Sequence, residues 1–403
     1  MNNILIIGIG SVGTLIGTTL IKAGLNVTFA GKAQSKRLSM AKKQGLKIFY
    51  QNGESFWLSP VDERVCFTDT ETYSPQQFPL IIVALKSNDL QKVSSYIKYH
   101  STKSTIIVHA QNGIPYWWFE DEKYLDSLDK NVSLNFREQP YLNSVDNRGT
   151  ILKKLRDRTL VGCVIKAPCH KMSDGSVKVS KPPRIILGMA KSSSDAKTQA
   201  AVKKLCQIFS INGVSANYTD NIRVAVCRKL AINVTTNVLS ALTGKIVADL
   251  TSNYYTNNLI KTIIKEVSII FQTYGLEARD LPTESQVYDY IREPGSQNHL
   301  PSLAQDFLQH RQGEISLITA LVEMAKIANI QVPTLSSLAE LLQLGQQYTI
   351  NTDKEKCHIL TFDRSTGCCL LNENAYQSNL FGQLHIPKLL NHLVKINVAA
   401  LSY

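Results

Sequence analysis

Three polar side chains recur at four-residue intervals in one segment of the chain, at Lys229, Asn233 and Asn237. In an α-helix this spacing stacks one cation and two amides on a single face. A positioned ammonium group can stabilise negative charge on a carbonyl oxygen and give it a proton. Neutral amides can hold a substrate without cancelling that charge. The four-residue spacing alone nevertheless favours an ordinary solvent-facing stripe over a binding site. The rest of the sequence must show which of the two applies.

A glycine-rich turn near the N-terminus is the second chemical signal. The turn Gly8-Ile9-Gly10-Ser11-Val12-Gly13 follows a β-branched run at 3–7 and opens a helical pattern that stops at Gly24. The run 25–30 then reads as a second strand. Strand, turn, helix and strand in this order are the context in which G-x-G-x-x-G predicts dinucleotide binding. The alternative is a glycine-rich turn of another α/β protein.

Each glycine of this turn has its own physical role in such a site. Gly8 permits the tight turn, Gly10 lets a pyrophosphate approach the backbone, and Gly13 lets the helix pack closely on the strand. The N-terminus of the helix faces the anion.

The residues after the second strand indicate which dinucleotide is bound. An acidic residue there would bind the ribose hydroxyls of NADH, but no acidic residue occurs before Glu54. The segment from Gly31 to Arg37 instead offers cations and a serine hydroxyl to a 2′-phosphate, which favours NADPH. Lys32, immediately after the strand, is the best candidate. Lys36 and Arg37 could simply be solvated on a helix face.

Two further apolar runs end in polar residues. The run 80–85 is followed by Lys86, and the run 106–109 by Gln111-Asn112-Gly113. Ligands of open α/β sheets bind outside the carboxyl ends of the strands. We therefore expect Lys86 and Asn112 to lie along the cofactor crevice.

Composition limits the class of protein. The chain has 403 residues, of which 44% are hydrophobic and 19% are charged, as in a globular protein of about two to three domains. A net charge of +12 favours an anionic partner, namely a phosphate-bearing ligand, a nucleic acid or a membrane surface. The basic run Lys153-Lys154-Leu155-Arg156 lacks a helix-turn-helix or an RNP-like pattern, so a nucleic acid is not expected.

Cysteine and histidine spacing indicate no metal or disulfide framework. The 8 cysteines include no C-x-x-C pair and the 8 histidines no H-E-x-x-H motif. A reducing cytoplasm fits this pattern. Glycines interrupt the apolar N-terminus and no basic residue precedes it, so a signal peptide is not expected, nor is a membrane span.

The remaining chain divides into strands and then helices. Runs at 160–165 and 184–187 predict two more strands of the sheet, whereas 115–158 shows no clear period. Helical stripes follow at 260–274 and 315–328. Ser302 with Gln305 has the form of a capping box, and Glu314 would open the next helix.

Together these segments are similar in type and order to the ketopantoate reductase family. The most specific are Arg228-Lys229-Leu230-Ala231-Ile232-Asn233 with Asn237, and Ser302-Leu303-Ala304-Gln305-Asp306 followed by Glu314. The glycine-rich turn, Lys86 and Gln111-Asn112-Gly113 complete the set, which covers about residues 1–345.

The resemblance implies an α/β fold with a doubly wound Rossmann domain at 1–195, including a long insertion at about 115–158. An all-helical domain like that of 6-phosphogluconate dehydrogenases would follow at 196–345, and an extra C-terminal tail at 346–403. The implied activity is NADPH-dependent reduction of 2-dehydropantoate (ketopantoate) to pantoate. The expected partners are a small 2-oxoacid and, as a candidate, a second copy of the chain in a homodimer.

The resemblance also implies roles for single residues. Lys229 would be the general acid, Asn233 and Asn237 would hold the hydroxyl and carbonyl region of the substrate, and Ser302 would bind its carboxylate. Asn112 would lie between substrate and cofactor. The residues expected to contact NADPH are Gly8, Ile9, Gly10, Ser11, Val12, Gly13, Lys32, Lys86, Asn112, Ala167 and Glu314.

The chain departs from the family pattern at three places, which bear on the substrate. Val238 replaces the usual proline after the second asparagine, the 115–158 region is long, and Ala167 is an approximate match to a cofactor-contacting alanine. Two alternatives therefore stay open. One is an NADP-dependent oxidoreductase acting on another 2-oxoacid or an opine-type substrate. The other is a non-enzymatic NADPH-binding regulator.

Overall fold

The computed structural model describes residues 3–192, 194–293, 296–297, 299–351, 360–362 and 369–371. Contacts within the chain divide it into two compact units. The first unit comprises Met1–Ala231, Val267–Thr283 and Glu323–Ile330, and the second comprises Ile232–Glu266, Glu284–Val322 and Gln331–Tyr403. This division cuts the chain at other places than the domain boundaries expected from the sequence, and those boundaries stay a prediction.

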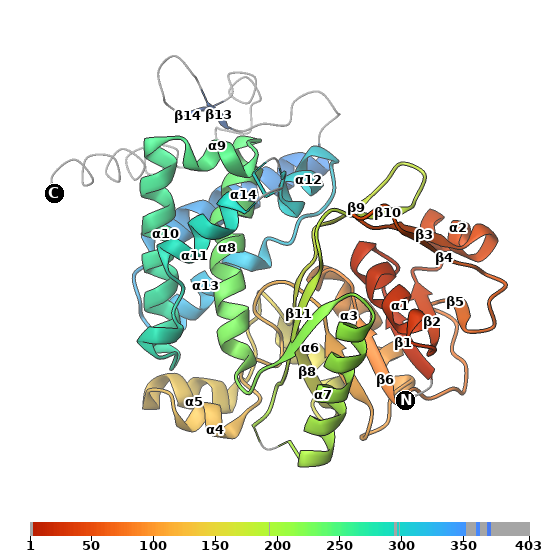
Figure 1. The fold of residues 1–403 in the computed structure, drawn as a ribbon. Helices are drawn as coiled ribbons and strands as arrows, with labels where there is room; N and C mark the ends of the chain where they lie inside the picture. Colours follow the sequence, from red (N-terminus) through yellow and green to blue (C-terminus); the bar gives the residue numbers. More distant parts are fainter. Residues whose placement is uncertain are drawn as a thin grey trace, which may run out of the picture. The chain divides into compact units, whose positions relative to one another are not determined.

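An 8-stranded sheet forms the centre of the first unit (Figure 1). Its strands, in spatial order, are β12 (Ser215–Tyr218), β11 (Arg184–Met189), β8 (Thr159–Lys166), β7 (Ile106–His109), β6 (Leu80–Val83), β1 (Asn3–Ile7), β2 (Asn26–Gly31) and β5 (Val65–Asp69). Neighbouring strands are parallel except β8 and β11, which are antiparallel. The order of strands from β5 to β8 is that of a doubly wound dinucleotide-binding sheet, which confirms the predicted fold class.

Helices on the sheet bury its apolar residues. Ile4, Ile6, Leu80 and Ile82 belong to one core cluster, together with residues of α1 (Ser11–Lys22), α2 (Lys36–Gln44) and α7 (Ala196–Ile211). Two further helices, α3 (Ser87–Tyr99) and α6 (Thr150–Leu155), pack against each other. The four residues of β6 and the four of β7 are all buried, as expected for parallel strands covered on both faces. The predicted strands at 106–109, 160–165 and 184–187 are thus confirmed as β7, β8 and β11.

A second, 4-stranded sheet lies beside α1 and was not expected from the sequence. Its order is β4 (Ser55–Leu58), β3 (Leu46–Phe49), β10 (Val177–Val179) and β9 (Cys169–Lys171). The chain continues from β8 into the β9–β10 hairpin, whose turn contains Gly175. This hairpin brings residues from the middle of the sequence to the N-terminal part of the unit.

The segment 115–158 is folded into the first unit. It forms α4 (Glu122–Asp126), α5 (Lys130–Glu138), a short 3₁₀ turn (Asn147–Gly149) and α6. Trp117, Trp118 and Phe119 have exposed fractions of 1%, 0% and 1%. The ring of Phe119 stacks on that of Phe136 with a centroid distance of 3.4 Å. The aromatic cluster that showed no period in the sequence is therefore part of the core.

The second unit is helical over most of its described residues. It includes parts of α8 (Ile222–Thr243), α10 (Tyr254–Thr273) and α13 (Ser316–Ile327), together with α9 (Val247–Thr251), α11 (Glu284–Arg292), α12 (Ser302–Leu308) and α14 (Pro333–Asn351). The helical stripes predicted at 260–274 and 315–328 correspond to α10 and α13. Buried Glu266 accepts hydrogen bonds from the backbone N–H groups of Thr334 and Leu335, which caps α14.

The capping-box prediction for Ser302 is wrong. Pro301 is the N-cap residue of α12, and Ser302 is the first residue inside the helix. Proline fits this position because its extended backbone precedes the helix, and the Gln305 side chain donates to the carbonyl of Leu300. Ser302 is exposed and lies inside the helix, one residue after the N-cap position.

Little of the expected tail lies within the described residues. Helix α14 runs into it as far as Asn351, and a short hairpin joins β13 (Leu360–Phe362) to β14 (Cys369–Leu371). The other tail residues lie outside the described part of the chain. Among the described helices, none has the length and apolar character that a membrane span requires.

Candidate active site

The glycine-rich turn has the backbone geometry that its sequence predicts. Gly8 has a φ of +107°, and a Cβ built on it would lie 2.5 Å from the carbonyl oxygen of Ala84. A Cβ on Gly13 would lie 1.9 Å from the carbonyl oxygen of Gly8. Only glycine fits at these two places, because any side chain would collide with backbone atoms. The lack of a side chain at Gly8 and Gly13 lets α1 pack tightly against the strands.

Gly10 differs from the other two glycines because it faces open space. A Cβ added there would meet nothing within 4 Å. Gly10 is the N-cap of α1, and the first turn of that helix contains no acidic residue. Backbone N–H groups at such a helix start attract an anion, and a bare glycine lets it come close. The geometry suits the phosphate groups of a dinucleotide.

Arg37 ties this turn to two other segments. Its Nε donates to the carbonyl of Ile9, its Nη2 donates to the Thr14 hydroxyl at 3.1 Å, and its Nη1 donates to the Gly175 carbonyl at 2.5 Å. The three acceptors are neutral, and partial burial lowers the pKa of the guanidinium. Arg37 is therefore not simply solvated on a helix face, since it holds the β9–β10 turn against the glycine-rich turn. Lys32 and Lys36 are exposed.

The polar residues that follow β6 and β7 lie at the carboxyl ends of those strands. Lys86 is half-buried and is the N-cap residue of α3. Gln111 donates from Nε2 to the carbonyl of Leu85 at 3.2 Å, which links the two loops. Because β6 and β7 are adjacent and parallel, Lys86 and Asn112 come from the same edge of the sheet.

Lys229 is held by two neutral oxygens in the first unit. Its Nζ donates to Asn112 Oδ1 at 2.7 Å and to the carbonyl of Ile165 at 2.5 Å. The helix predicted around this residue is confirmed as α8, and the carbonyl comes from the last part of β8. Both acceptors are neutral, and an ammonium group can stabilise an oxygen that gains negative charge. Lys229 and Asn112 are 117 positions apart in the sequence.

Two thiols lie within the electrostatic reach of Lys229. Burial raises the pKa of Cys163 to about 12, and the nearby Lys229 charge opposes that shift. Burial raises the pKa of Cys169 to about 12 as well, again against Lys229. Both groups are therefore protonated thiols near neutral pH and poor nucleophiles.

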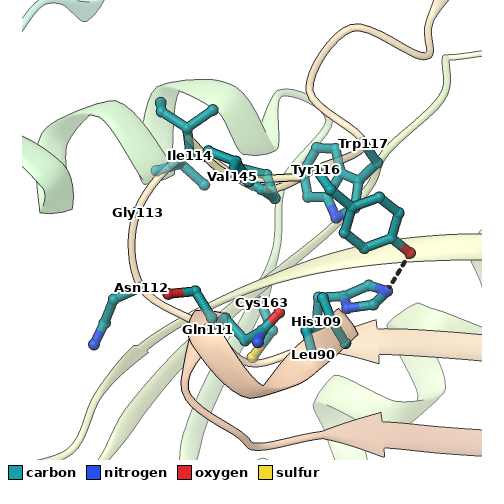
Figure 2. A pocket seen from close by; sticks show the side chains of 13 residues that line it. Leu90, His109, Gln111, Asn112, Gly113, Ile114, Tyr116, Trp117, Val145 and Cys163 are labelled. Carbon is teal, nitrogen blue, oxygen red and sulfur yellow. Dashed lines mark hydrogen bonds between the residues drawn. The ribbon is translucent and has the colours of Figure 1, made fainter. Parts of the chain in front are cut away.

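Asn112 also lines a pocket within the first unit (Figure 2). His109, Tyr116 and Trp117 gather on one side of it, and Gln111, Asn112 and Cys163 lie on another. Tyr116 shares a hydrogen bond of 2.9 Å between its hydroxyl and His109 Nε2. Burial lowers the pKa of His109 to about 3, so the imidazole is neutral. We call this hollow the inner pocket.

Four of the expected site residues lie in the second unit. Asn233 is half-buried, and Asn237 has an exposed fraction of 7% with its side-chain oxygen 3.3 Å from the Thr236 hydroxyl. Ser302 is exposed on α12. Glu314 has an exposed fraction of 7% and lies two residues before α13, where its carbonyl accepts from the N–H of Leu317. Ala167 belongs to the first unit and directly follows β8, partly buried.

Three features of the site were missed in the sequence. The Ile165 carbonyl is a backbone group, which leaves no signature in residue type. The Arg37 contact to Gly175 spans 138 positions and depends on the unexpected small sheet. His109 offered a signal, since a histidine within an apolar strand must find a partner or a ligand. In the described part of the chain, no group of His, Cys, Asp or Glu side chains could hold a metal ion.

Comparison with family models decides the family. Residues 4–116 match the family model "Ketopantoate reductase PanE/ApbA", and residues 221–346 match "Ketopantoate reductase PanE/ApbA C terminal". The chain belongs to the ketopantoate reductase PanE/ApbA family. It is accordingly an NAD(P)-dependent oxidoreductase of this family.

Individual relatives are similar to this chain at low sequence identity. The chain is 24% identical over 342 residues to the 2-dehydropantoate 2-reductase of Mesorhizobium japonicum, which covers 84% of this chain and 96% of that protein. A solved D-mandelate dehydrogenase with NADH and anilino(oxo)acetate is 20% identical, with a TM-score of 0.66 over 86% of this chain and 99% of the other. The dimeric ketopantoate reductase of Staphylococcus aureus is 18% identical, with a TM-score of 0.62 over 86% and 99%.

Proposed function

We propose that this PanE/ApbA-family enzyme reduces 2-dehydropantoate to pantoate with NADPH. The observation that carries the proposal is the position of Lys229, whose ammonium group is held by Asn112 and by the Ile165 carbonyl. The relative from Mesorhizobium japonicum is named for this reaction. In the reaction, the keto carbon receives a hydride and the keto oxygen receives a proton.

Lys229 supplies the proton in this proposal. Hydride arriving at the keto carbon leaves negative charge on the oxygen, and an ammonium group beside it stabilises that charge before giving up its proton. The two neutral acceptors fix the direction of the Nζ atom without forming an ion pair. Asn112 Oδ1 keeps the Lys229 side chain in place. The ammonium group of Lys229 can then donate a hydrogen bond to the carbonyl oxygen of the substrate.

The chain is suited to NADPH at the glycine-rich turn. When bound, the reduced nicotinamide supplies the hydride. The open face of Gly10 and the start of α1 would hold the pyrophosphate, with Ile9, Ser11 and Val12 in the same turn. Exposed Lys32 after β2 would bind the 2′-phosphate, and no acidic residue occurs in the first turn of α2. NADH is the alternative dinucleotide, because the D-mandelate dehydrogenase was solved with it.

The other site residues follow the family resemblance. Asn233 and Asn237 would hold the hydroxyl and carbonyl region of the substrate, and the exposed hydroxyl of Ser302 would bind its carboxylate. Lys86, Ala167 and Glu314 would contact the cofactor. Buried Glu314 can accept hydrogen bonds from a carboxamide or a ribose.

We further propose the domain boundaries, assembly and compartment expected from the sequence. These are a cofactor domain at 1–195, a substrate domain at 196–345 and an appended tail at 346–403. A homodimer is favoured by the dimeric relative from Staphylococcus aureus. A cytoplasmic location is consistent with 8 cysteines that show no framework spacing.

The deciding experiment follows NADPH oxidation by absorbance with the purified full chain. The substrate panel contains 2-dehydropantoate, pyruvate, phenylglyoxylate and 3,3-dimethyl-2-oxobutanoate, with and without added amino acids, and NADH replaces NADPH in parallel. Fast turnover of 2-dehydropantoate supports the proposal. Preference for phenylglyoxylate, or turnover that requires an amino acid, would replace it with another 2-oxoacid or an opine-type substrate. NADPH binding without any turnover would favour a regulator.

A further inference from the structure

A buried hydrogen bond closes the loop that carries Asn112. The loop runs from His109, the last residue of β7, to Tyr116, and the Tyr116 hydroxyl lies 2.9 Å from His109 Nε2 (Figure 2). The two rings contact edge to face, with centroids 4.9 Å apart. The exposed fractions of His109 and Tyr116 are 3% and 2%. A polar contact therefore joins the two ends of the loop, and Asn112 lies between them in the sequence.

A second contact fixes the loop to the neighbouring strand. The Gln111 side chain is hydrogen-bonded to His109, and it donates from Nε2 to the carbonyl of Leu85, which follows β6. The contact with Gln111 raises the pKa of His109 against the effect of burial, as an acceptor does by stabilising the protonated ring. Gln111 thus accepts from the imidazole through its oxygen and donates to Leu85 through its nitrogen. One chain of hydrogen bonds leads from Tyr116 to Leu85, directly beside Asn112.

Each member of this chain keeps one protonation state near neutral pH. Burial lowers the pKa of His109 to about 3, so the imidazole is neutral. Burial raises the pKa of Tyr116 well above its ordinary value, with smaller effects of Asp146 and Glu120 in the same direction, so the hydroxyl keeps its proton. A neutral imidazole accepts at one nitrogen and donates from the other. Tyr116 therefore donates to His109, and His109 donates to Gln111.

Stability alone does not require this polar chain. Apolar side chains of the same shape in place of two hydrogen-bonded groups can be nearly neutral for stability. Hydrogen bonds are directional, and a buried network whose members all have partners holds a segment in one arrangement. The place of the chain shows which segment is held. Asn112 follows Gln111 directly, and it accepts from Lys229 Nζ at 2.7 Å.

We infer that His109 and Tyr116 are positioning residues for the reaction, because they hold the loop so that Asn112 Oδ1 meets the ammonium group of Lys229. This inference rests on the proposed function, in which Lys229 protonates the keto oxygen. A general acid must lie within hydrogen-bond reach of the atom that it protonates, and a displacement of about 1 Å can lower the rate about 10²-fold. Neither His109 nor Tyr116 needs to touch the substrate.

The test removes the Tyr116 hydroxyl and keeps its ring. Tyr116→Phe breaks the bond at the base of the loop, while the edge-to-face packing on His109 can stay. Tyr274→Phe is the matched control, because Tyr274 has an exposed fraction of 0% and donates its hydroxyl to the Met324 carbonyl at 2.9 Å. That contact involves no residue of the loop. Hydrogen–deuterium exchange of residues 110–116 and steady-state kinetics with NADPH are measured on the full chain of each variant.

We expect Tyr116→Phe to speed amide exchange in the loop and to lower kcat about tenfold, because the proton donor is less well placed. KM for 2-dehydropantoate should change less than about threefold, since the lost effect concerns the transition state and not substrate binding. Affinity for NADPH should stay at the wild-type value. Tyr274→Phe should leave kcat and the exchange of the loop unchanged, even if Tm falls equally in both variants.

A double-mutant cycle shows whether the hydroxyl acts through Asn112. Asn112→Ala removes the acceptor of Lys229, so adding Tyr116→Phe should lower kcat by less than about twofold further. Independent effects would multiply instead and give about tenfold further loss. A second probe is His109→Leu combined with Tyr116→Phe, which also removes the contact with Gln111. It should lower kcat at least as much as Tyr116→Phe, again only where Asn112 is present.

Three outcomes would overturn the inference. Wild-type kcat in Tyr116→Phe, with or without faster exchange, would make the hydrogen bond purely structural. A multiplied loss in the Asn112→Ala background would mean that the hydroxyl acts by another route. Equal losses of kcat in Tyr116→Phe and Tyr274→Phe would indicate a general loosening of the fold.

Failure of the proposed function gives a different result. If wild type prefers another 2-oxoacid, that compound replaces 2-dehydropantoate in the proposed function, and the same cycle with it decides the inference. Absence of turnover by wild type with every 2-oxoacid of the panel would refute the proposed function, and the inference with it.

Discussion

Lys229 donates a hydrogen bond from Nζ to Asn112 Oδ1 over 2.7 Å. The amide belongs to the loop after β7 and the lysine to α8. The hydrogen bond therefore joins two segments that are far apart in the sequence. The contact differs from an ion pair because the acceptor is neutral. The hydrogen bond thus orients the lysine through a neutral group.

We expect Lys229→Ala to lower kcat by about 10²–10⁴, the usual contribution of a positioned general acid. Affinity for NADPH should be unchanged, because the lysine acts on the keto oxygen. Stopped-flow turnover and fluorescence titration of NADPH measure the two effects separately. Lys197→Ala, which removes an exposed lysine on α7, is the control. Unchanged turnover in Lys229→Ala would remove lysine from the mechanism.

Replacing the neutral acceptor by a charged one should slow proton transfer. Asn112→Asp places a carboxylate at 2.7 Å from the ammonium group, which stabilises the protonated lysine. The alkaline limb of the kcat profile should move to higher pH, and kcat at neutral pH should fall. Asn112→Ala should lower kcat without that displacement. A profile that is identical in both variants would show that Asn112 does not act through Lys229.

Substitutions of Lys32 and Arg37, the two basic residues discussed near the start of α2, should affect cofactor binding differently. Exposed Lys32 has no described hydrogen bond from its side chain, whereas Arg37 holds the glycine-rich turn. Lys32→Ala should weaken NADPH about tenfold to a hundredfold and leave NADH nearly unchanged, as expected for one charge-assisted contact. Arg37→Ala should weaken both dinucleotides. Calorimetric titration with each cofactor decides, and an equal loss in Lys32→Ala would place the 2′-phosphate elsewhere.

Substitutions at two glycines of the glycine-rich turn should affect stability and dinucleotide binding separately. Gly13→Ala puts a methyl group 1.9 Å from the Gly8 carbonyl oxygen, so it should lower Tm. An overpacking cost of about 1–3 kcal/mol corresponds to a Tm lower by roughly 2–10 °C. Gly10→Ala meets no protein atom within 4 Å, so Tm should be unchanged while dinucleotide affinity falls. Normal cofactor affinity in Gly10→Ala would argue against a pyrophosphate at this turn.

Buried His109 should make the fold sensitive to acid. Its pKa is lowered to about 3 in the folded protein, compared with the ordinary value of 6.5. Between these values the unfolded chain binds the extra proton, so the free energy of unfolding falls as the pH drops from about 6.5 toward 3. The groups that face the imidazole are Tyr116 and Gln111, and neither is an acid that would offset this loss.

The check is Tm as a function of pH for wild type and for His109→Leu with Tyr116→Phe. The double variant should lose less stability than wild type below about pH 6.5, because the group that must be protonated is gone. Parallel curves for the two proteins would contradict a neutral buried imidazole.

The local elements of the fold could be predicted because their signals are local. The glycine-rich turn, the buried strands of the main sheet and the helical stripe of α10 each lie within one short segment. The pairing of β3 with β10 joins distant segments without a strong period in either. The capping box failed at Ser302 because Pro301, one residue earlier, already fixes the start of α12.

The site could be predicted only in part for the same reason. Lys229 and Asn112 are visible through the family motifs, but their contact is a property of the folded chain. The Ile165 carbonyl is invisible to any argument from residue type. His109 and Trp117 were passed over as strand and cluster residues, because the surroundings of a buried polar group are known only in the folded chain.

The hydrogen bond from Arg37 to the Gly175 carbonyl limits where a tag can be inserted into the protein. A turn at the tip of a hairpin is normally a place where a peptide tag or a fused domain can be inserted. The 172–176 turn should not tolerate such an insertion. An insertion there would break the hydrogen bond from Arg37 to the Gly175 carbonyl, and the same guanidinium also contacts the glycine-rich turn. The turn at Gly53 between β3 and β4 is exposed and has nothing within 4 Å of its Cα substituent position. It is the better attachment point for a fluorophore or a surface linker on this enzyme.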